Sequence, residues 1–277
     1  MKRNLIVSHG DGDGVISTAL LAEKHKLNLQ ETDIVFTQPF LVDKVKTDGY
    51  EQIYVCDLAI NNRNLNMTWD FIQAIEDRLV VWYDHHEGWT DENVWSTKHK
   101  VDIGNSSCAA LIGGDQKWID AADAIDSRKG HSDLGQLLDQ ALKVNLSDNE
   151  VREYAFNYVL GLNNGSLLEK KQKEYETIQE KTRQLVNSGE AKGQVLVVNA
   201  QGHIGFDRTQ IFMMGYEKAP FVVVLGEFQD KVTTTVATNT KTNLVKVFNL
   251  GSGSPFRVSF EGDHVERVVN TLNSLQD

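Results

Sequence analysis

The sequence predicts an α/β protein: an N-terminal domain built on a parallel sheet, a long helix, and a smaller C-terminal domain of mixed α/β structure. Short apolar runs alternate with helical stretches in the N-terminal part, a pattern typical of a parallel sheet. Apolar residues then recur at near-heptad spacing amid Lys, Glu and Gln, as in a long, mostly exposed helix. Strand-like runs resume afterwards. We therefore expect a domain over residues 1–165, a helical linker over 166–192 and a second domain over 193–277.

The composition of the 277 residues, with a net charge of −11, is ordinary for a soluble globular protein. No apolar run approaches the ~20 residues of a membrane helix, and the N-terminal apolar run is too short for a signal peptide. Long duplex nucleic acid requires a basic face, but no basic run exceeds Lys170-Lys171. We expect Cys56 and Cys108, which lie in apolar stretches, to be buried free thiols of a cytoplasmic protein. Neither long duplex nor membrane is an expected partner.

Four strands and several helices are expected in the first domain. Apolar runs predict the strands at 4–8, 33–37, 52–56 and 79–82. A helix is expected over 15–22, after a glycine-rich turn, and another around 69–75, where apolar residues keep helical spacing. Further helices are expected at 106–112, with serine as the cap, at 118–127, and within 133–163.

Acids and histidines follow three of these strands. The first strand runs into His9-Gly10-Asp11-Gly12-Asp13-Gly14, the third is followed by Asp57, and the fourth by Asp84-His85-His86. Taken singly, the first cluster is equally well a polar turn, although it lacks the ligands of a helix–loop–helix calcium site. Asp57 alone is better explained as a helix cap. In a parallel sheet, however, the carboxyl ends of the strands share one edge. The three clusters should therefore converge, which predicts a metal site.

The predicted helix over 118–127 offers two candidates for a last metal ligand, Asp123 and Asp126. The alternative for either residue is a position on a solvated helix face. Carboxylate and imidazole ligands without thiolate favour Mn²⁺ or Mg²⁺, and the histidines favour Mn²⁺.

The second domain is predicted from strands at 195–199, 221–225 and 232–238 and helices at 207–216 and 263–275. Between the last strand and the last helix lies Gly251-Ser252-Gly253-Ser254-Pro255-Phe256-Arg257. This loop is a hairpin turn or a phosphate cradle, and taken alone the turn is favoured. Residues 188–193 are a hypothetical joint at which the two domains could close.

These motifs resemble those of the DHH phosphoesterase superfamily. The resemblance rests on His9-x-Asp11-x-Asp13-Gly14, Asp57, Asp84-His85-His86 and the later Asp123 and Asp126, and it covers residues 1 to about 130. The C-terminal part more weakly resembles the substrate-binding domain that accompanies DHH domains. That domain carries a Gly-Gly-Gly-His loop, whereas here serine replaces one glycine and Ser254 replaces the histidine. Val55-Cys56-Asp57-Leu58-Ala59-Ile60-Asn61 and the short His9 spacing are most similar to the branch that degrades very short RNA oligomers, the nanoRNases.

The resemblance implies a metal-dependent phosphoesterase with two divalent ions. His9, Asp11 and Asp57 would hold one ion, and Asp57 would bridge to a second held by Asp13, His85 and Asp126 or Asp123. The ions would activate a water for attack on phosphorus. We expect His86 to donate a proton to the substrate and Asp84 to orient the neighbouring imidazoles. Residues expected to hold the substrate, each arginine being equally well a surface charge, are Arg208, Gly251, Gly253, Ser254 and Arg257.

The expected substrate is a short oligoribonucleotide or a small phosphorylated nucleotide, and a homodimer is possible. Two alternatives remain open from the sequence: a hydrolase of pyrophosphate or polyphosphate, and a catalytically inactive binding protein on the same fold. Filled ligand positions count against the inactive protein.

Overall fold

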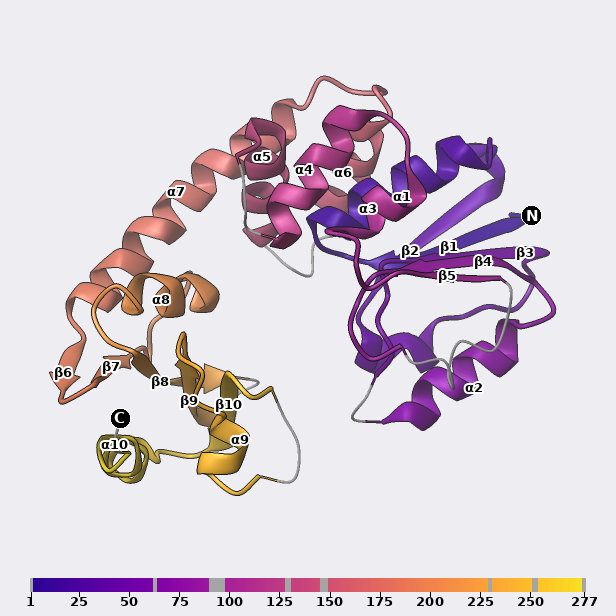
Figure 1. Cartoon of the computed structure of the whole chain (residues 1–277). Coiled ribbons are helices and arrows are strands. Elements are labelled where there is room, and N and C mark those ends of the chain that lie inside the picture. The colour runs from indigo at the N-terminus through magenta and orange to yellow at the C-terminus, as the bar shows by residue number, and fades with distance from the viewer. Residues whose placement is uncertain are drawn as a thin grey trace. The chain divides into compact units, whose positions relative to one another are not determined.

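The computed structural model describes residues 2–61, 64–89, 98–127, 131–144, 149–228, 231–250 and 254–275. The chain divides into two compact units, Met1–Tyr175 and Glu176–Asp277. The division falls inside α7 (Ser166–Asn187), a helix of 22 residues that begins where the heptad-like spacing begins (Figure 1). Each unit has its own five-stranded sheet with helices on both faces, so the α/β class predicted from the sequence is confirmed.

The sheet of the first unit is entirely parallel. Its spatial order is β2-β1-β3-β4-β5, so the chain starts in the interior of the sheet and crosses over. The strands are β1 (Asn4–His9), β2 (Thr32–Thr37), β3 (Gln52–Cys56), β4 (Leu79–Asp84) and β5 (His99–Val101). Because all five run in one direction, their carboxyl ends lie along a single edge.

Two layers of helices cover this sheet. One face packs on α1 (Gly12–Lys24), α3 (Cys108–Ile112), α4 (Gln116–Ser127), α5 (Asp133–Lys143) and α6 (Asn149–Val159). The other face packs on α2 (Leu65–Ile75) and η2 (Pro39–Lys44). Figure 1 shows these two sets on opposite sides of the strands. The strands are accordingly buried on both faces, which explains why they read as continuous apolar runs.

Several element boundaries differ from those expected. Helix α1 begins at Gly12 rather than at residue 15, because Asp11 caps it by accepting a hydrogen bond from the Gly14 amide. Strand β4 continues to Asp84, so this acid belongs to the strand itself. The stretch 133–163, expected to be helical, forms α5 and α6. Strand β5 was not predicted, since three residues are too few to show a pattern.

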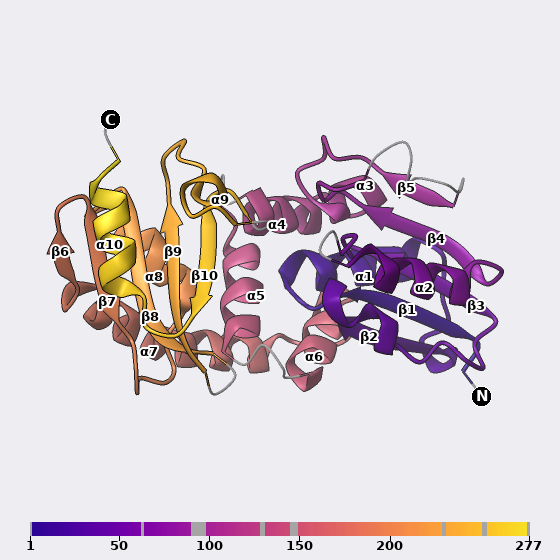
Figure 2. The same ribbon diagram turned by 90° about the horizontal axis from the view of Figure 1, so that it is seen from below.

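The sheet of the second unit is mixed, in the order β10-β9-β8-β7-β6. Its strands are β6 (Glu190–Lys192), β7 (Val195–Asn199), β8 (Phe221–Phe228), β9 (Lys231–Thr238) and β10 (Arg257–Glu261). Among the described strands of this sheet, only β7 and β8 pair in parallel. Helix α8 (Arg208–Gly215) packs on one face, and α9 (Leu244–Val247) and α10 (Val265–Asn273) pack on the other, as Figure 2 shows. The sequence missed β6 and β10, whose side chains are mostly exposed.

Cys56 and Cys108 are buried free thiols, as expected. None of the described helices is both long enough and apolar enough to cross a membrane.

Candidate metal centre

The first cluster is built by the turn from β1 into α1. His9 Nδ1 lies 2.8 Å from Asp11 Oδ2, and His9 Nε2 lies 3.0 Å from Gln38 Oε1. Gly14 is the point of closest approach, because a methyl group there would overlap the His9 carbonyl and lie 2.9 Å from Asp57 Oδ2. Glycine is therefore needed at this helical position because a side chain would not fit.

Asp13 points into the unit from the first turn of α1 and is fully buried. Its carboxylate accepts hydrogen bonds from the amides of Cys108 (2.7 Å) and Ala109 (3.1 Å) at the start of α3, and from Ser17 Oγ (3.0 Å). Helix N-termini stabilise negative charge, so the start of α3 holds this carboxylate in place.

Asp57 follows β3 with a positive φ of 52°, a conformation uncommon for residues other than glycine. Its side chain is 1% exposed, and neither carboxylate oxygen has a hydrogen-bond partner among the described residues. Buried polar atoms are normally satisfied, because an unsatisfied one costs about 1–3 kcal/mol. Two such oxygens on one buried acid indicate a ligand with positive charge.

The third cluster leaves the end of β4. His85 Nδ1 lies 3.2 Å from the carbonyl oxygen of Asn105, which fixes Nδ1 as the donor and leaves Nε2 as a ligand atom. His85 Nε2 lies 3.0 Å from Asp126 Oδ2, 3.5 Å from Asp13 Oδ2 and 3.6 Å from Asp57 Oδ1. Asp84 is fully buried, and its Oδ1 accepts a hydrogen bond of 2.7 Å from His86 Nδ1.

Helix α4 separates the two candidates for the last ligand. Asp126 joins Asp13 and His85, whereas Asp123 accepts a 2.5 Å hydrogen bond from Ser107 Oγ. The same Ser107 Oγ caps α3 by accepting a hydrogen bond from the Ala110 amide. The geometry therefore brings Asp126 beside Asp13 and His85 and holds Asp123 at the α3 cap.

Three groups of potential ligands result, and in each the ligand atoms lie within 4.8 Å of one another. The groups are His9, Asp11 and Asp57; Asp13, His85 and Asp126; and Asp57, His85 and His86. Asp57 belongs to two groups. The donors are carboxylate oxygens and imidazole nitrogens without a cysteine, which fits Mn²⁺ or Mg²⁺. The strand-end clusters thus converge as expected, and the individual ligand roles stay predictions.

The electrostatics of the centre are unfavourable without a cation. Burial, then the charges of Asp13 and Asp11, raises the pKa of Asp57 well above its usual value. Burial, then Asp126 and Asp11, raises the pKa of Asp13 to about 6. Burial opposes the shift at His85, but Asp126 and Asp13 outweigh it and raise that pKa to about 9. Asp13 and Asp57 therefore bind protons more readily than ordinary carboxylates, and a bound cation would compete with those protons.

The predicted substrate residues belong to the second unit. Arg208 is the first residue of α8, and its Nη2 donates a 3.1 Å hydrogen bond to the Glu227 carbonyl. The guanidinium of Arg257, on β10, lies over the Phe212 ring at 4.8 Å. Burial, then the charge of Arg257, lowers the pKa of Arg208, so the two cations are close. Ser254 Oγ accepts a hydrogen bond of 3.4 Å from the Phe256 amide, whereas Gly251 and Gly253 lie outside the described residues.

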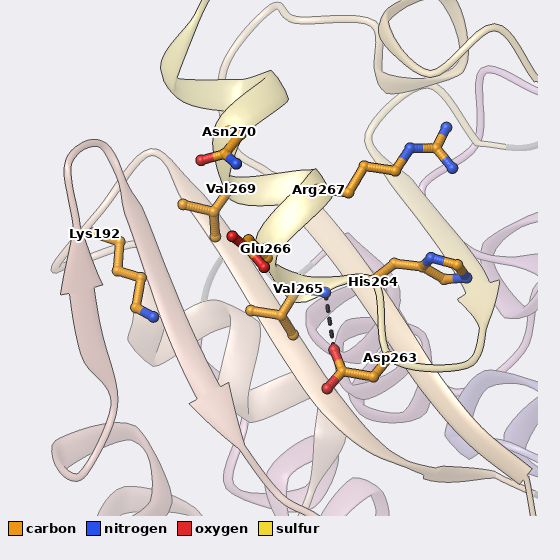
Figure 3. Close-up of a pocket in the computed structure, with 8 residues that line it drawn as sticks. All are labelled: Lys192, Asp263, His264, Val265, Glu266, Arg267, Val269 and Asn270. Carbon is orange, nitrogen blue, oxygen red and sulfur yellow. Dashed lines mark hydrogen bonds between the residues drawn. The ribbon is translucent and has the colours of Figure 1, made fainter.

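A hollow of about 700 Å³ in the same unit lies beside the start of α10 and takes in none of these residues. Figure 3 shows acidic and basic side chains mixed around it, with Asp263 accepting a hydrogen bond from the Val265 amide. This mixture of charges does not favour an anionic ligand.

Sequence reasoning missed three residues that support the centre. Gln38 contacts His9, and Trp89 Nε1 donates to Asp84 Oδ2. Arg152 of α6 is 7% exposed and donates a 2.8 Å hydrogen bond from Nε to the Gly10 carbonyl. Only Trp89 carried a sequence signal, since it lies five residues after Asp84. Arg152 and Gln38 reach the site from elements that the sequence does not connect to it.

No family model and no curated protein matches the sequence. Among solved structures, the chain is similar to a pGpG-specific phosphodiesterase, PggH from Vibrio cholerae, with 14% identity, a TM-score of 0.68 and coverage of 99% of this chain and 98% of that chain. The chain is also similar to a DHH domain described as a member of the s1p family of ribosomal proteins, with 11% identity, a TM-score of 0.67 and coverage of 100% of this chain and 88% of that chain. A structure of the exonuclease RecJ bound to manganese shows 14% identity, a TM-score of 0.58 and coverage of 100% of this chain and 91% of that chain.

The fold and the clustered strand-end acids define an α/β protein with a candidate centre for divalent cations. More specifically, the chain has the fold of the DHH proteins, and the predicted resemblance to that superfamily is confirmed at the level of the fold.

Proposed function

We propose that this protein is a metal-dependent phosphoesterase of the DHH type that hydrolyses short oligoribonucleotides or small phosphorylated nucleotides. The observation that carries the proposal is Asp57. Its two buried oxygens lack hydrogen-bond partners among the described residues, and it belongs to two of the three groups of potential ligands. A structural acid with those surroundings would destabilise the fold, whereas a bridging ligand requires them.

We propose that His9, Asp11 and Asp57 hold one divalent ion and that Asp13, Asp57, His85 and Asp126 hold a second. When bound, such ions supply a nucleophile at neutral pH and stabilise charge on the phosphoryl oxygens. Manganese is the proposed metal because the donor set fits it and because the similar RecJ structure is described as bound to manganese.

His86 is proposed to give a proton to the substrate. Its side chain is 37% exposed, and its Nδ1 faces the buried Asp84, so Nε2 is the nitrogen left to meet a ligand. Asp84 orients the ring and favours its protonated form. Burial opposes this effect, but the hydrogen bond and charge of Asp84 raise the pKa of His86.

Arg208 and Arg257 are proposed to bind the part of the substrate that is not cleaved. Arg208 is the first residue of α8, and burial, then the nearby charge of Arg257, lowers its pKa. Guanidinium groups bind phosphate by charge-assisted hydrogen bonds, and two that lie close together can bind one phosphate. Ser254 stands where related domains carry a histidine, so the contact of that histidine is not reproduced.

Among the substrate classes, a linear dinucleotide is the first to test, because PggH is named for pGpG. The assay uses purified protein with Mn²⁺ and four substrates: a linear diribonucleotide, a cyclic dinucleotide, a 3′,5′-bisphosphonucleoside and polyphosphate. We expect the linear diribonucleotide to be cleaved fastest. Preference for polyphosphate would favour the anhydride hydrolase, and Mn²⁺ binding without turnover of any substrate would favour an inactive binding protein.

The matched variants are Asp57→Asn and Asp120→Asn. Asp120 is exposed on α4, the helix that carries Asp126. We expect Asp57→Asn to abolish both turnover and Mn²⁺ binding measured by calorimetry, and Asp120→Asn to preserve both. Full turnover in Asp57→Asn would refute the proposal.

A further inference from the structure

Asp84 is a fully buried carboxylate with two hydrogen-bond donors on different oxygens. His86 Nδ1 donates to Oδ1 at 2.7 Å, and the indole Nε1 of Trp89 donates to Oδ2. The main-chain carbonyl of Asp84 also accepts a 3.1 Å hydrogen bond from the Asp102 amide. Both the backbone and the side chain of this acid are therefore fixed.

Trp89 is itself held by aromatic packing. It is 7% exposed, meets Trp82 edge-on at 5.4 Å between ring centroids, and lies at 5.4 Å from the ring of His99. Trp82 is fully buried and donates from Nε1 to the carbonyl of Leu58, 3.2 Å away. The two indoles of this packed cluster thus donate hydrogen bonds to two neighbouring strand ends, one beside Asp57 and one at Asp84.

The chemistry of indole gives this contact a direction. An indole N–H only donates, so Asp84 Oδ2 must accept. Two donors to the charged form stabilise a buried carboxylate against desolvation. Asp84 Oδ1 accepts as well, so the neutral His86 ring carries its proton on Nδ1. Nε2 of His86 is then the nitrogen that faces outward.

We propose that Trp89 is a positioning residue for the reaction: through Asp84 it fixes the tautomer and the orientation of His86. The inference rests on the proposed function for its catalytic consequence. Its structural content, the state of the His86 ring, is independent of which substrate is cleaved.

The first test compares Trp89→Phe with Trp118→Phe. Phenylalanine keeps the aromatic packing and removes only the N–H. Trp118 is buried in the same unit and meets Tyr158 edge-on, so its variant controls for the loss of an indole. We expect Trp89→Phe to lower kcat by about 10–100-fold, the usual cost of losing an outer hydrogen-bond partner. KM and the affinity for Mn²⁺ should stay within twofold of wild type, and Trp118→Phe should leave kcat unchanged.

The second readout is the nitrogen NMR of His86 in metal-free protein, at a pH where the ring is neutral, with signals assigned by their loss in His86→Gln. We expect the wild type to show the Nδ1–H tautomer alone and Trp89→Phe to show a mixture of tautomers. A third measurement leaves Trp89 in place: Asp84→Asn should shift the indole N–H resonance of Trp89 and leave that of Trp118 unchanged. This measurement decides the question if Trp89→Phe does not fold.

Unchanged kcat in folded Trp89→Phe, an equal loss of kcat and Mn²⁺ affinity, or a Trp89 resonance unaffected by Asp84→Asn would each overturn the inference. If wild-type protein cleaves no substrate, the proposed function fails, but the tautomer of His86 still decides the role of Trp89. If wild-type protein is active and the tautomer is the same in both proteins, the function stands and the inference fails.

Discussion

The two sheets of this protein have the same number of strands and bury very different polar groups. The first unit buries the carboxylates of Asp13, Asp57 and Asp84 at or near the ends of its strands. Among the described residues of the second unit, the buried polar side chains are all threonines: Thr182, Thr234, Thr235 and Thr238. Hydroxyls cost less to bury than charges. The first unit therefore buries carboxylates at a cost in stability, whereas the described part of the second unit buries only hydroxyl groups among its polar side chains.

The second sheet satisfies its buried hydroxyls internally. Thr234 donates to the Gly262 carbonyl at 2.8 Å, Thr235 lies 3.0 Å from the Ser259 hydroxyl, and Thr238 donates to the Pro220 carbonyl at 3.0 Å. Asp57 in the first unit has no such partner among the described residues. Violations of a rule that the rest of the protein obeys are expected at functional sites. The comparison therefore supports the proposed metal centre in the first unit, and the following experiments test that proposal.

The largest effect is expected for Asp57→Asn. Turnover should fall more than about 100-fold, because even outer partners of a metal ligand cost about 10–100-fold. In chelator, the same variant should unfold at a higher temperature than wild type at pH 8, since it removes an acid that is unfavourable to bury beside Asp13 and Asp11, and an amide tolerates positive φ. Thermal unfolding followed by fluorescence checks this. Thr235→Val is the control from the other sheet, and it should leave turnover unchanged. A less stable Asp57→Asn protein would contradict the comparison.

The next effect separates two acids on one helix. Asp126→Asn should weaken Mn²⁺ binding by more than about 10-fold, because Asp126 stands with Asp13 and His85. Asp123→Asn should leave the affinity close to wild type, since Asp123 accepts its hydrogen bond from Ser107. Isothermal titration calorimetry measures both. Equal losses in the two variants would show that the centre extends further along α4.

The second unit should contribute binding without chemistry. Arg208→Ala and Arg257→Ala should each raise KM by about 10-fold, as expected for a hydrogen bond to a charged group worth about 1.5 kcal/mol. Their kcat and Mn²⁺ affinity should stay unchanged. Arg267→Ala is the matched control, because Arg267 lines the hollow beside α10 instead. Steady-state kinetics on the preferred substrate checks the split, and a comparable rise of KM in Arg267→Ala would contradict it.

The smallest effect is a dependence of metal-free stability on pH. The pKa of Asp13 is raised from 3.8 to about 6 by burial and nearby acids. Between these two pH values the folded protein therefore binds more protons than the unfolded protein. Stability should therefore fall as pH rises through about 6. The pKa of His85, raised from 6.5 to about 9 because Asp126 and Asp13 outweigh burial, extends the fall to higher pH. Asp11, whose pKa is lowered to about 2 because His9 outweighs burial, acts only in acid.

We expect the unfolding temperature in chelator to drop by a few degrees between about pH 5.5 and pH 8.5. The gain on adding Mn²⁺ should grow over the same range, because the metal replaces bound protons. Scanning fluorimetry across this range measures both quantities. Stability that rises with pH in chelator would show that the carboxylates are already satisfied without a cation.

The sequence predicted the convergence of three clusters because strand direction alone brings the ends of parallel strands together. It could not choose between Asp123 and Asp126, since residues three apart lie on the same face of a helix. The choice depends on Ser107, which lies outside α4 and donates a hydrogen bond to Asp123. Arg152 was missed for the same reason: its partner, the Gly10 carbonyl, lies 142 residues away. Contacts set by tertiary packing leave no periodic pattern.

The lack of space at Gly14 limits which substitutions the first unit can tolerate, in contrast to the second unit. A Cβ at Gly14 would overlap the His9 carbonyl and lie 2.9 Å from Asp57 Oδ2, so a larger residue there would displace both clusters. The arginines of the second unit are two separate side chains on different elements, and each can be replaced alone. Under the proposed function, substrate preference could therefore change in small steps, whereas the metal centre would be kept or lost as a whole.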